Sequence, residues 1–173
     1  MAHSVELLFD AETEAVVRDI WDELAAADLP SQAHHTAPSN RPHVTLVVAD
    51  RIGADIDALL RPMAQQLPLQ CAIGAPVLFG RSSAVLARLV VPTEELLAFH
   101  AETHRLGSRY LVPGPMPNSL PGRWTAHVTL ARRVGGAALG RALGIAGRPP
   151  EIVGSFAGLR RWDGTQRVEN AIG

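Results

Sequence analysis

Residues 41–48 read RPHVTLVV, and the tetrapeptide HVTL inside them occurs again at residues 127–130, 84 positions further on. Each copy alternates polar with apolar side chains and is rich in β-branched residues, which is typical of a strand with one buried face. Alternate side chains of a strand share a face, so His43 and Thr45 point one way, as do His127 and Thr129. The valine and leucine of each copy are expected to point into a core.

The segments around the two copies repeat in the same order. Before each copy we expect a strand, a helix and a proline-rich loop. The first set occupies residues 4–9, 11–27 (with Asp10 as N-cap) and 28–42, and the second occupies 84–91, 93–110 and 112–124. Further helices are expected at 54–67 and 136–145, and further strands at 69–79, 151–161 and 166–172. This internal duplication predicts one pseudo-two-fold domain, residues 1–173, built from two lobes that each present one HVTL strand.

A two-fold axis between the two HVTL strands would bring two imidazoles and two hydroxyls into one cleft. Histidine titrates near neutral pH, so one ring can act as a base and the other as an acid. The threonine hydroxyls can donate hydrogen bonds to the non-bridging oxygens of a phosphate. The set suits a phosphodiester and requires no metal. The alternative is a pair of ordinary amphipathic strands with polar residues on their exposed faces.

Composition limits the class of protein. Of the 173 residues 47% are hydrophobic, yet no apolar run reaches the roughly 18 residues of a membrane span, so we expect no membrane partner. A net charge of −1 argues against a binder of long duplex DNA, although arginines gather in residues 61–173 and acidic residues in 1–60. The single cysteine, Cys71, cannot form an internal disulfide, and no secretory signal is visible, so we expect a cytoplasmic protein.

The segments PHVTLVV (42–48) and AHVTLARR (126–133) resemble the 2H phosphoesterase superfamily, and within it the 2′-5′ RNA ligase or RNA 2′,3′-cyclic phosphodiesterase group. The resemblance implies a bilobal α+β fold with two antiparallel sheets around a central cleft and helices outside. It implies cofactor-independent, metal-independent chemistry on a 2′,3′-cyclic phosphate or a 2′-5′ linkage, in a small phosphodiester or at an RNA end. By position it makes His43 and His127 the catalytic pair, and Thr45 and Thr129 the phosphate-binding residues.

Other residues near the motifs are weaker candidates. Arg41 and Arg123 precede the two histidines with a parity that would let them clamp a phosphate, or they are solvated loop arginines. Trp124 could stack on a base or fill the core. Arg132 has the opposite parity to His127, so we expect it on the surface rather than in the cleft.

Two further pairs of histidines bear on the site. His34 and His35 lie in the first proline-rich loop, which should border the mouth of the cleft. His100 and His104 have the i, i+4 spacing of a helical metal site, but residue 101 is Ala rather than the Glu of H-E-x-x-H, and exposed histidines are the better interpretation.

Three functional alternatives stay open at this point. The substrate could be a small nucleotide or ADP-ribose cyclic phosphate rather than RNA. The cleft could belong to a non-catalytic module that binds a phosphorylated ligand or RNA. A metal-dependent hydrolase is the weakest option. Which histidine is the base does not follow from the sequence, because the two halves are nearly equivalent.

Overall fold

A computed structural model of the chain describes residues 2–80 and 83–173. The elements that carry the fold are β1 (His3–Phe9), α1 (Ala11–Ala26), β2 (His43–Ile52), α2 (Ile56–Ala64), β3 (Leu69–Phe79), β4 (Ala84–Val90), α3 (Glu94–Gly107), β5 (Leu111–Pro115), β6 (His127–Val134), α4 (Gly136–Ala146), β7 (Ile152–Asp163) and β8 (Val168–Ile172). Three short 3-10 helices lie in the loops, at Gln32–His34, Ser108–Tyr110 and Pro117–Ser119.

One strand was not expected from the sequence. β5 lies in the second proline-rich loop, where three prolines at 113, 115 and 117 obscure any strand signal. It forms because it pairs along the far end of β2, with Ile52 opposite Leu111 and Ala49 opposite Pro115. Tertiary pairing therefore overrides local propensity at this edge.

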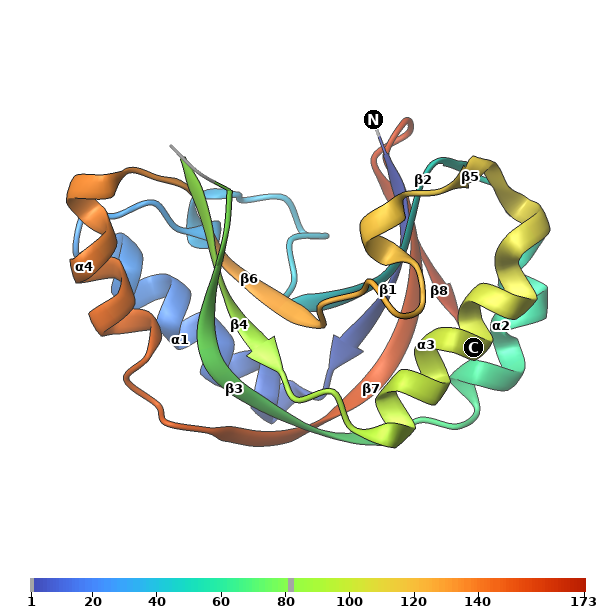
Figure 1. Cartoon of the computed structure of the whole chain (residues 1–173), viewed down its shortest axis with the longest axis horizontal. Coiled ribbons are helices and arrows are strands. Elements are labelled where there is room, and N and C mark those ends of the chain that lie inside the picture. Colours follow the sequence, from blue (N-terminus) through green and yellow to red (C-terminus); the bar gives the residue numbers. More distant parts are fainter. Residues whose placement is uncertain (1, 81–82) are drawn as a thin grey trace.

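The strands of the described residues form one eight-stranded antiparallel sheet that divides into two layers, and these layers meet along a central seam between β2 and β6 (Figure 1). The pairing order is β1-β2-β6-β4-β3-β7-β8, and β1 also pairs with β7. The first half of β7 pairs with β3 and its second half with β1 and β8, so β7 runs through both layers. β2 and β6 are paired at one position, where Val44 lies opposite Val128. An antiparallel sheet covered by helices confirms the predicted α+β class, although the strands belong to one continuous sheet rather than to two separate ones.

The helices cover the outer faces of these layers in pairs. α2 and α3 pack together against β2, β7 and β8, and α1 and α4 pack together on the opposite side against β4, β6 and β7 (Figure 1). Asp10 caps α1 as predicted, accepting from the amide of Thr13 at 2.8 Å. Because α1 precedes β2 in the chain but packs with α4, each lobe contains elements from both halves of the sequence.

Both HVTL strands bury their apolar residues and then change register at the same place. Opposite β2, Glu6 pairs with Thr45 and Val5 with Val47, so Leu46 is an extra residue. Opposite β6, Ala87 pairs with Thr129 and Leu86 with Ala131, so Leu130 is the extra residue. Such a bulge exchanges the two faces of the strand beyond it. Residues after the bulge therefore lie on the face opposite to the one that simple alternation predicts.

Within residues 2–80 and 83–173, no helix is both long enough and apolar enough to cross a membrane.

Candidate active site

The structure brings the two HVTL motifs together at the seam between the lobes. His43 and His127 are the first residues of β2 and β6, and the equivalent residues Val44 and Val128 face each other across the seam. Because the strands are antiparallel, His43 comes near Thr129, and Thr45 near His127, on the face opposite the buried valines. All four predicted polar residues thus lie around the pseudo-two-fold axis.

The two histidines are held in the same way. The Nδ1 of His43 donates to the carbonyl of Arg41 at 2.7 Å, and the Nδ1 of His127 donates to the carbonyl of Thr125, also at 2.7 Å. A carbonyl only accepts, so Nδ1 carries a hydrogen in both rings. In the neutral ring this leaves the lone pair on Nε2, which is the atom available for proton transfer.

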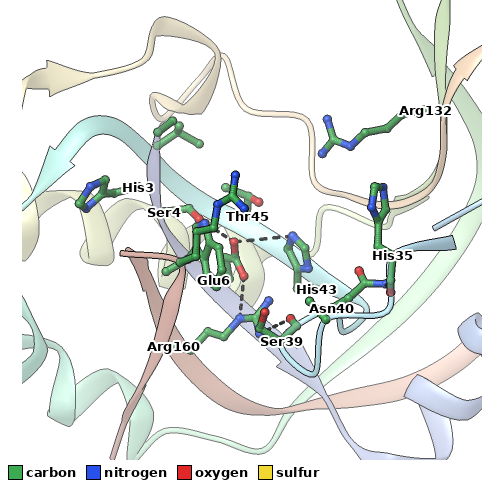
Figure 2. A pocket seen from close by; sticks show the side chains of 15 residues that line it. His3, Ser4, Glu6, His35, Ser39, Asn40, His43, Thr45, Arg132 and Arg160 are labelled. Carbon is green, nitrogen blue, oxygen red and sulfur yellow. Dashed lines mark hydrogen bonds and ion pairs between the residues drawn. The ribbon is translucent and has the colours of Figure 1, made fainter. Parts of the chain in front are cut away.

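Two cavities meet at this point. The first cavity, of about 630 Å³, is lined by residues that include Glu6, His35, His43, Thr45, Arg132 and Arg160 (Figure 2). The second cavity, of about 560 Å³, is lined by residues that include Thr45, Phe79, Arg123, His127, Thr129 and Arg132. Thr45, Val48 and Arg132 line both. The arrangement offers one central point with a compartment on each side, which suits a ligand whose two halves are joined by a small polar group.

Arg132 faces the site, contrary to the prediction from parity. The bulge at Leu130 turns the strand, so both Leu130 and Ala131 are buried and the next side chain returns to the cleft side. Val48 occupies the equivalent place after the bulge in β2, and it also lines both cavities. The site therefore has a cation on one side of its axis and a valine on the other.

The other candidates have different environments. The guanidinium of Arg41 pairs with Glu14 of α1 at 2.7 Å, and it does not line either cavity. Arg123 lines the second cavity. Trp124 also lines it, but its Nε1 donates to the carbonyl of Thr45 at 2.9 Å and its ring stacks on His100 at 3.9 Å. The Trp124 side chain is therefore held in place by its contacts with β2 and α3.

His100 and His104 are buried, so the expectation of exposed residues is wrong. Both Nε2 atoms lie within hydrogen-bond distance of the carbonyl of Leu46, and His100 also reaches the carbonyl of Ser119 at 2.9 Å. Burial, together with the neighbouring His104, lowers the pKa of His100 to about 4. The two histidines are therefore neutral rings whose hydrogen bonds connect α3 to the bulge of β2. The part of the chain that the structure describes holds no group of three or more His, Cys, Asp or Glu side chains placed to bind a metal.

The immediate surroundings of the two histidines differ. The ring of Phe79 packs against His127 with centroids 4.5 Å apart. Burial lowers the pKa of His127, and the charges of His43 and Arg132 lower it further, against the opposing effect of the bond to Thr125. His43 instead faces a carboxylate, since its Nε2 lies 3.6 Å from Oε1 of Glu6. Sequence reasoning missed Phe79 and Glu6, although Glu6 is the one charged residue in the otherwise apolar run of β1.

Comparison with known proteins places these features in a family. The family described as the 2′-5′ RNA ligase superfamily matches residues 12–160. Usb1 of Kluyveromyces marxianus has the same fold, with a TM-score of 0.54, 12% identity, and 99% of this chain and 97% of that chain covered.

Two further structures are similar. The same Usb1 with uridine monophosphate gives a TM-score of 0.52 at 12% identity, covering 99% of this chain and 97% of that one. E. coli LigT complexed with 3′-AMP gives 0.50 at 14% identity, covering 98% and 91%. No curated protein matches the chain in sequence. The match over residues 12–160, together with the paired HVTL strands, shows that the chain belongs to the 2′-5′ RNA ligase superfamily of 2H phosphoesterases.

Proposed function

We propose that this chain is a metal-independent phosphodiesterase that hydrolyses a 2′,3′-cyclic phosphate, at an RNA end or in a nucleotide, or a 2′-5′ phosphodiester. The main support for the proposal is that equivalent hydrogen bonds orient the two histidine rings. Each Nδ1 is bonded to the carbonyl two residues earlier, so each Nε2 is available beside a threonine of the partner strand. Two such rings supply the base and the acid that phosphodiester hydrolysis needs.

In this mechanism one Nε2 removes a proton from water as the water oxygen forms a bond to phosphorus. The bond from phosphorus to the leaving ribose oxygen breaks, and the other ring, protonated at Nε2, gives its proton to that oxygen. Thr45 and Thr129 donate hydrogen bonds to the non-bridging oxygens and so fix the phosphorus between the rings. With a ribose hydroxyl as the nucleophile, the reverse reaction would form a linkage.

The two cavities support a small substrate or the end of a chain. Their volumes, about 630 and 560 Å³, are those of compartments for one small organic group each. The ligands named for the structural neighbours, uridine monophosphate and 3′-AMP, are single nucleotides, which agrees with this size. We propose that residues 1–173 act as one domain and that the protein works in the cytoplasm, where the thiol of Cys71 stays reduced.

A direct assay tests the proposed function. The purified protein, treated with a chelator, is given nucleoside 2′,3′-cyclic phosphates, a short RNA ending in a 2′,3′-cyclic phosphate, an ADP-ribose cyclic phosphate and a 2′-5′ dinucleotide. We expect turnover of at least one of them, and its loss in the double variant His43→Ala, His127→Ala. Saturable binding without product would identify a binding module instead. Turnover abolished by the chelator would identify a metal-dependent hydrolase.

Substitution of Arg132 tests whether its guanidinium contributes to the reaction. Because Arg132 lines both cavities, its guanidinium can donate charge-assisted hydrogen bonds to the phosphate between them. We expect Arg132→Gln to lower kcat/KM by about 10–100-fold, the value of one such bond. Arg133→Gln is the matched control, since Arg133 is the next residue and lines neither cavity. Equal effects of the two substitutions would mean that Arg132 acts only through the general positive charge of β6.

A further inference from the structure

We propose that Glu6 is a positioning residue that holds His43 as the protonated partner, so that His43 is the general acid of hydrolysis and His127 is the general base. This inference rests on the phosphodiesterase function proposed above. It decides between two rings that the sequence leaves equivalent.

The carboxylate of Glu6 lies near the reactive nitrogen of His43 but does not form a hydrogen bond with it. Glu6 stands on β1 directly opposite Thr45 and is only 4% exposed. Its Oε1 lies 3.6 Å from Nε2 of His43 and accepts a hydrogen bond from Oγ of Ser4 at 2.5 Å (Figure 2). A separation of 3.6 Å is too long for a hydrogen bond but short enough for strong attraction between opposite charges. The hydrogen on Nε2 therefore stays available to a leaving oxygen.

Glu6 shares its arginine partner with a second carboxylate. Nε of Arg160 donates to Oε2 of Glu6 at 2.7 Å, and Nη1 of the same guanidinium donates to Oε2 of Glu169 at 2.5 Å and to the carbonyl of Ser39 at 2.9 Å. Two carboxylates thus share one guanidinium. Glu6 is the buried member of the two carboxylates, and His43 is the other basic side chain that it faces, so an imidazolium there would be a second positive partner.

The surroundings of Glu6 favour its ionised form. Burial raises the pKa of Glu6, but the charges of His43 and Arg160 and the bonds from Ser4 and Arg160 outweigh burial, and the pKa ends below its ordinary value. Glu6 is therefore a carboxylate at neutral pH, as the stabilisation of an imidazolium requires.

The other titratable and charged groups around His43 are arginines or histidines. Arg132 and His127 approach from β6, His35 from the loop after the first 3-10 helix, and Arg160 from β7 behind Glu6. His3 of β1 and Arg167 of the turn before β8 line the same cavity. Among the described residues that line the first cavity, Glu6 is the only carboxylate. Glu6 is thus the negative charge in the surroundings of His43, and Arg132 is a positive charge that opposes it.

The equivalent position beside the other ring lacks a carboxylate. Glu6 is opposite Thr45 in the pairing of β1 with β2, and Ala87 is opposite Thr129 in the pairing of β4 with β6. None of the described residues around the second cavity is acidic, and Phe79 and Arg132 lie beside His127 instead. An apolar ring and a cation favour the neutral imidazole, whose Nε2 accepts a proton. The difference between Glu6 and Ala87 at these equivalent positions therefore distinguishes the general acid from the general base.

The test is the pH dependence of kcat/KM for hydrolysis in Glu6→Gln, which removes the charge and keeps the shape. An acid must be protonated, so its deprotonation produces the alkaline limb, and a base must be neutral, so its protonation produces the acidic limb. Without Glu6 the proton on His43 is held less tightly. We expect the alkaline limb to move to lower pH by about one unit while the acidic limb stays in place. Movement of the acidic limb alone would reverse the assignment and overturn the proposal.

Three variants separate this effect from a structural one. Glu6→Asp keeps the charge and should keep the alkaline limb near its native position. Asp57→Asn is the matched control, because Asp57 pairs with Arg161, the neighbouring arginine of β7, at 2.8 Å, and should move neither limb. Glu169→Gln removes the surplus charge from the half-exposed end of the network without disturbing the core, and should move the alkaline limb in the same direction by less.

Titration of the histidine ring signals by NMR in the free protein makes the two proposals separable. We expect the His43 ring in Glu6→Gln to lose its proton at lower pH than in the native protein, and the His127 ring to titrate as before. If hydrolysis is intact but the His43 ring and the alkaline limb both stay in place, the role of Glu6 is wrong and the phosphodiesterase stands. If the ring moves but no substrate is hydrolysed by the native protein, the phosphodiesterase is wrong, and the acid role falls with it.

Discussion

Replacement of His43 or of His127 by alanine lowers kcat for hydrolysis of the cyclic phosphate by about 10²–10⁴-fold, the contribution of one positioned acid or base. Each ring moves one proton through Nε2, and neither alanine can do so. The only hydrogen bond of the His127 side chain is to the carbonyl two residues before it, so the thermal unfolding midpoint of His127→Ala should change little. His43→Ala also removes the basic neighbour of the buried Glu6 carboxylate, so we expect a lower midpoint for that variant. The double variant should lose much less than the product of the single losses, because two residues that act in one step are not additive.

A single-turnover assay with each variant at saturating substrate measures this loss without interference from product release. His34→Ala is the matched control, because His34 lies in the same proline-rich loop as His35 but is exposed and lines neither cavity. Its rate should equal that of the native protein. Near-native rates in either active-site variant would remove that histidine from the proposed mechanism.

Replacement of Arg88 by methionine lowers the free energy of unfolding by about 3–5 kcal/mol. Each buried carbonyl that loses its donor costs about 1–3 kcal/mol, and removal of the buried guanidinium charge offsets part of the total. Arg88 lies on β4 with no exposed surface. Its guanidinium donates to the carbonyls of Gly74, Ala146 at 2.7 Å, Pro150 at 3.3 Å and Ile73 at 3.4 Å. One side chain thus joins β3, the end of α4 and the loop that leads to β7.

Urea denaturation followed by circular dichroism measures this change. Arg141→Met is the matched control, since Arg141 also donates to a backbone carbonyl, that of Ala27 at 3.0 Å, but at the surface. There water replaces the lost donor, and we expect a change within about 0.5 kcal/mol. A loss below about 1 kcal/mol for Arg88→Met would mean that the four carbonyls find other partners.

The features predictable from the sequence are those fixed by local alternation. HVTL alternates polar and apolar residues over four positions, which is enough to assign the faces of His43, Thr45, His127 and Thr129 before any partner strand is known. The duplication then predicts that the two motifs meet. Both expectations hold because strand periodicity and chain symmetry do not depend on which residues pack against the strand.

The features that the sequence did not predict depend on how the strands pair with one another. The bulges at Leu46 and Leu130 arise from the register against β1 and β4, and the second of them turns Arg132 into the site. His100 and His104 have the composition of a polar helix face, yet they are buried because the carbonyl of Leu46 accepts from both. Glu6 stands in an apolar strand, and only the pairing with β2 shows that it faces His43.

The exchange of helices between the lobes makes each lobe depend on the whole chain. A half-chain that ends after β3 would contain β1 and β2 of one lobe but would place α1 on the other, where α4 would be missing. Neither half of the chain therefore contains all the elements of one lobe, and we expect the two lobes to fold and unfold together.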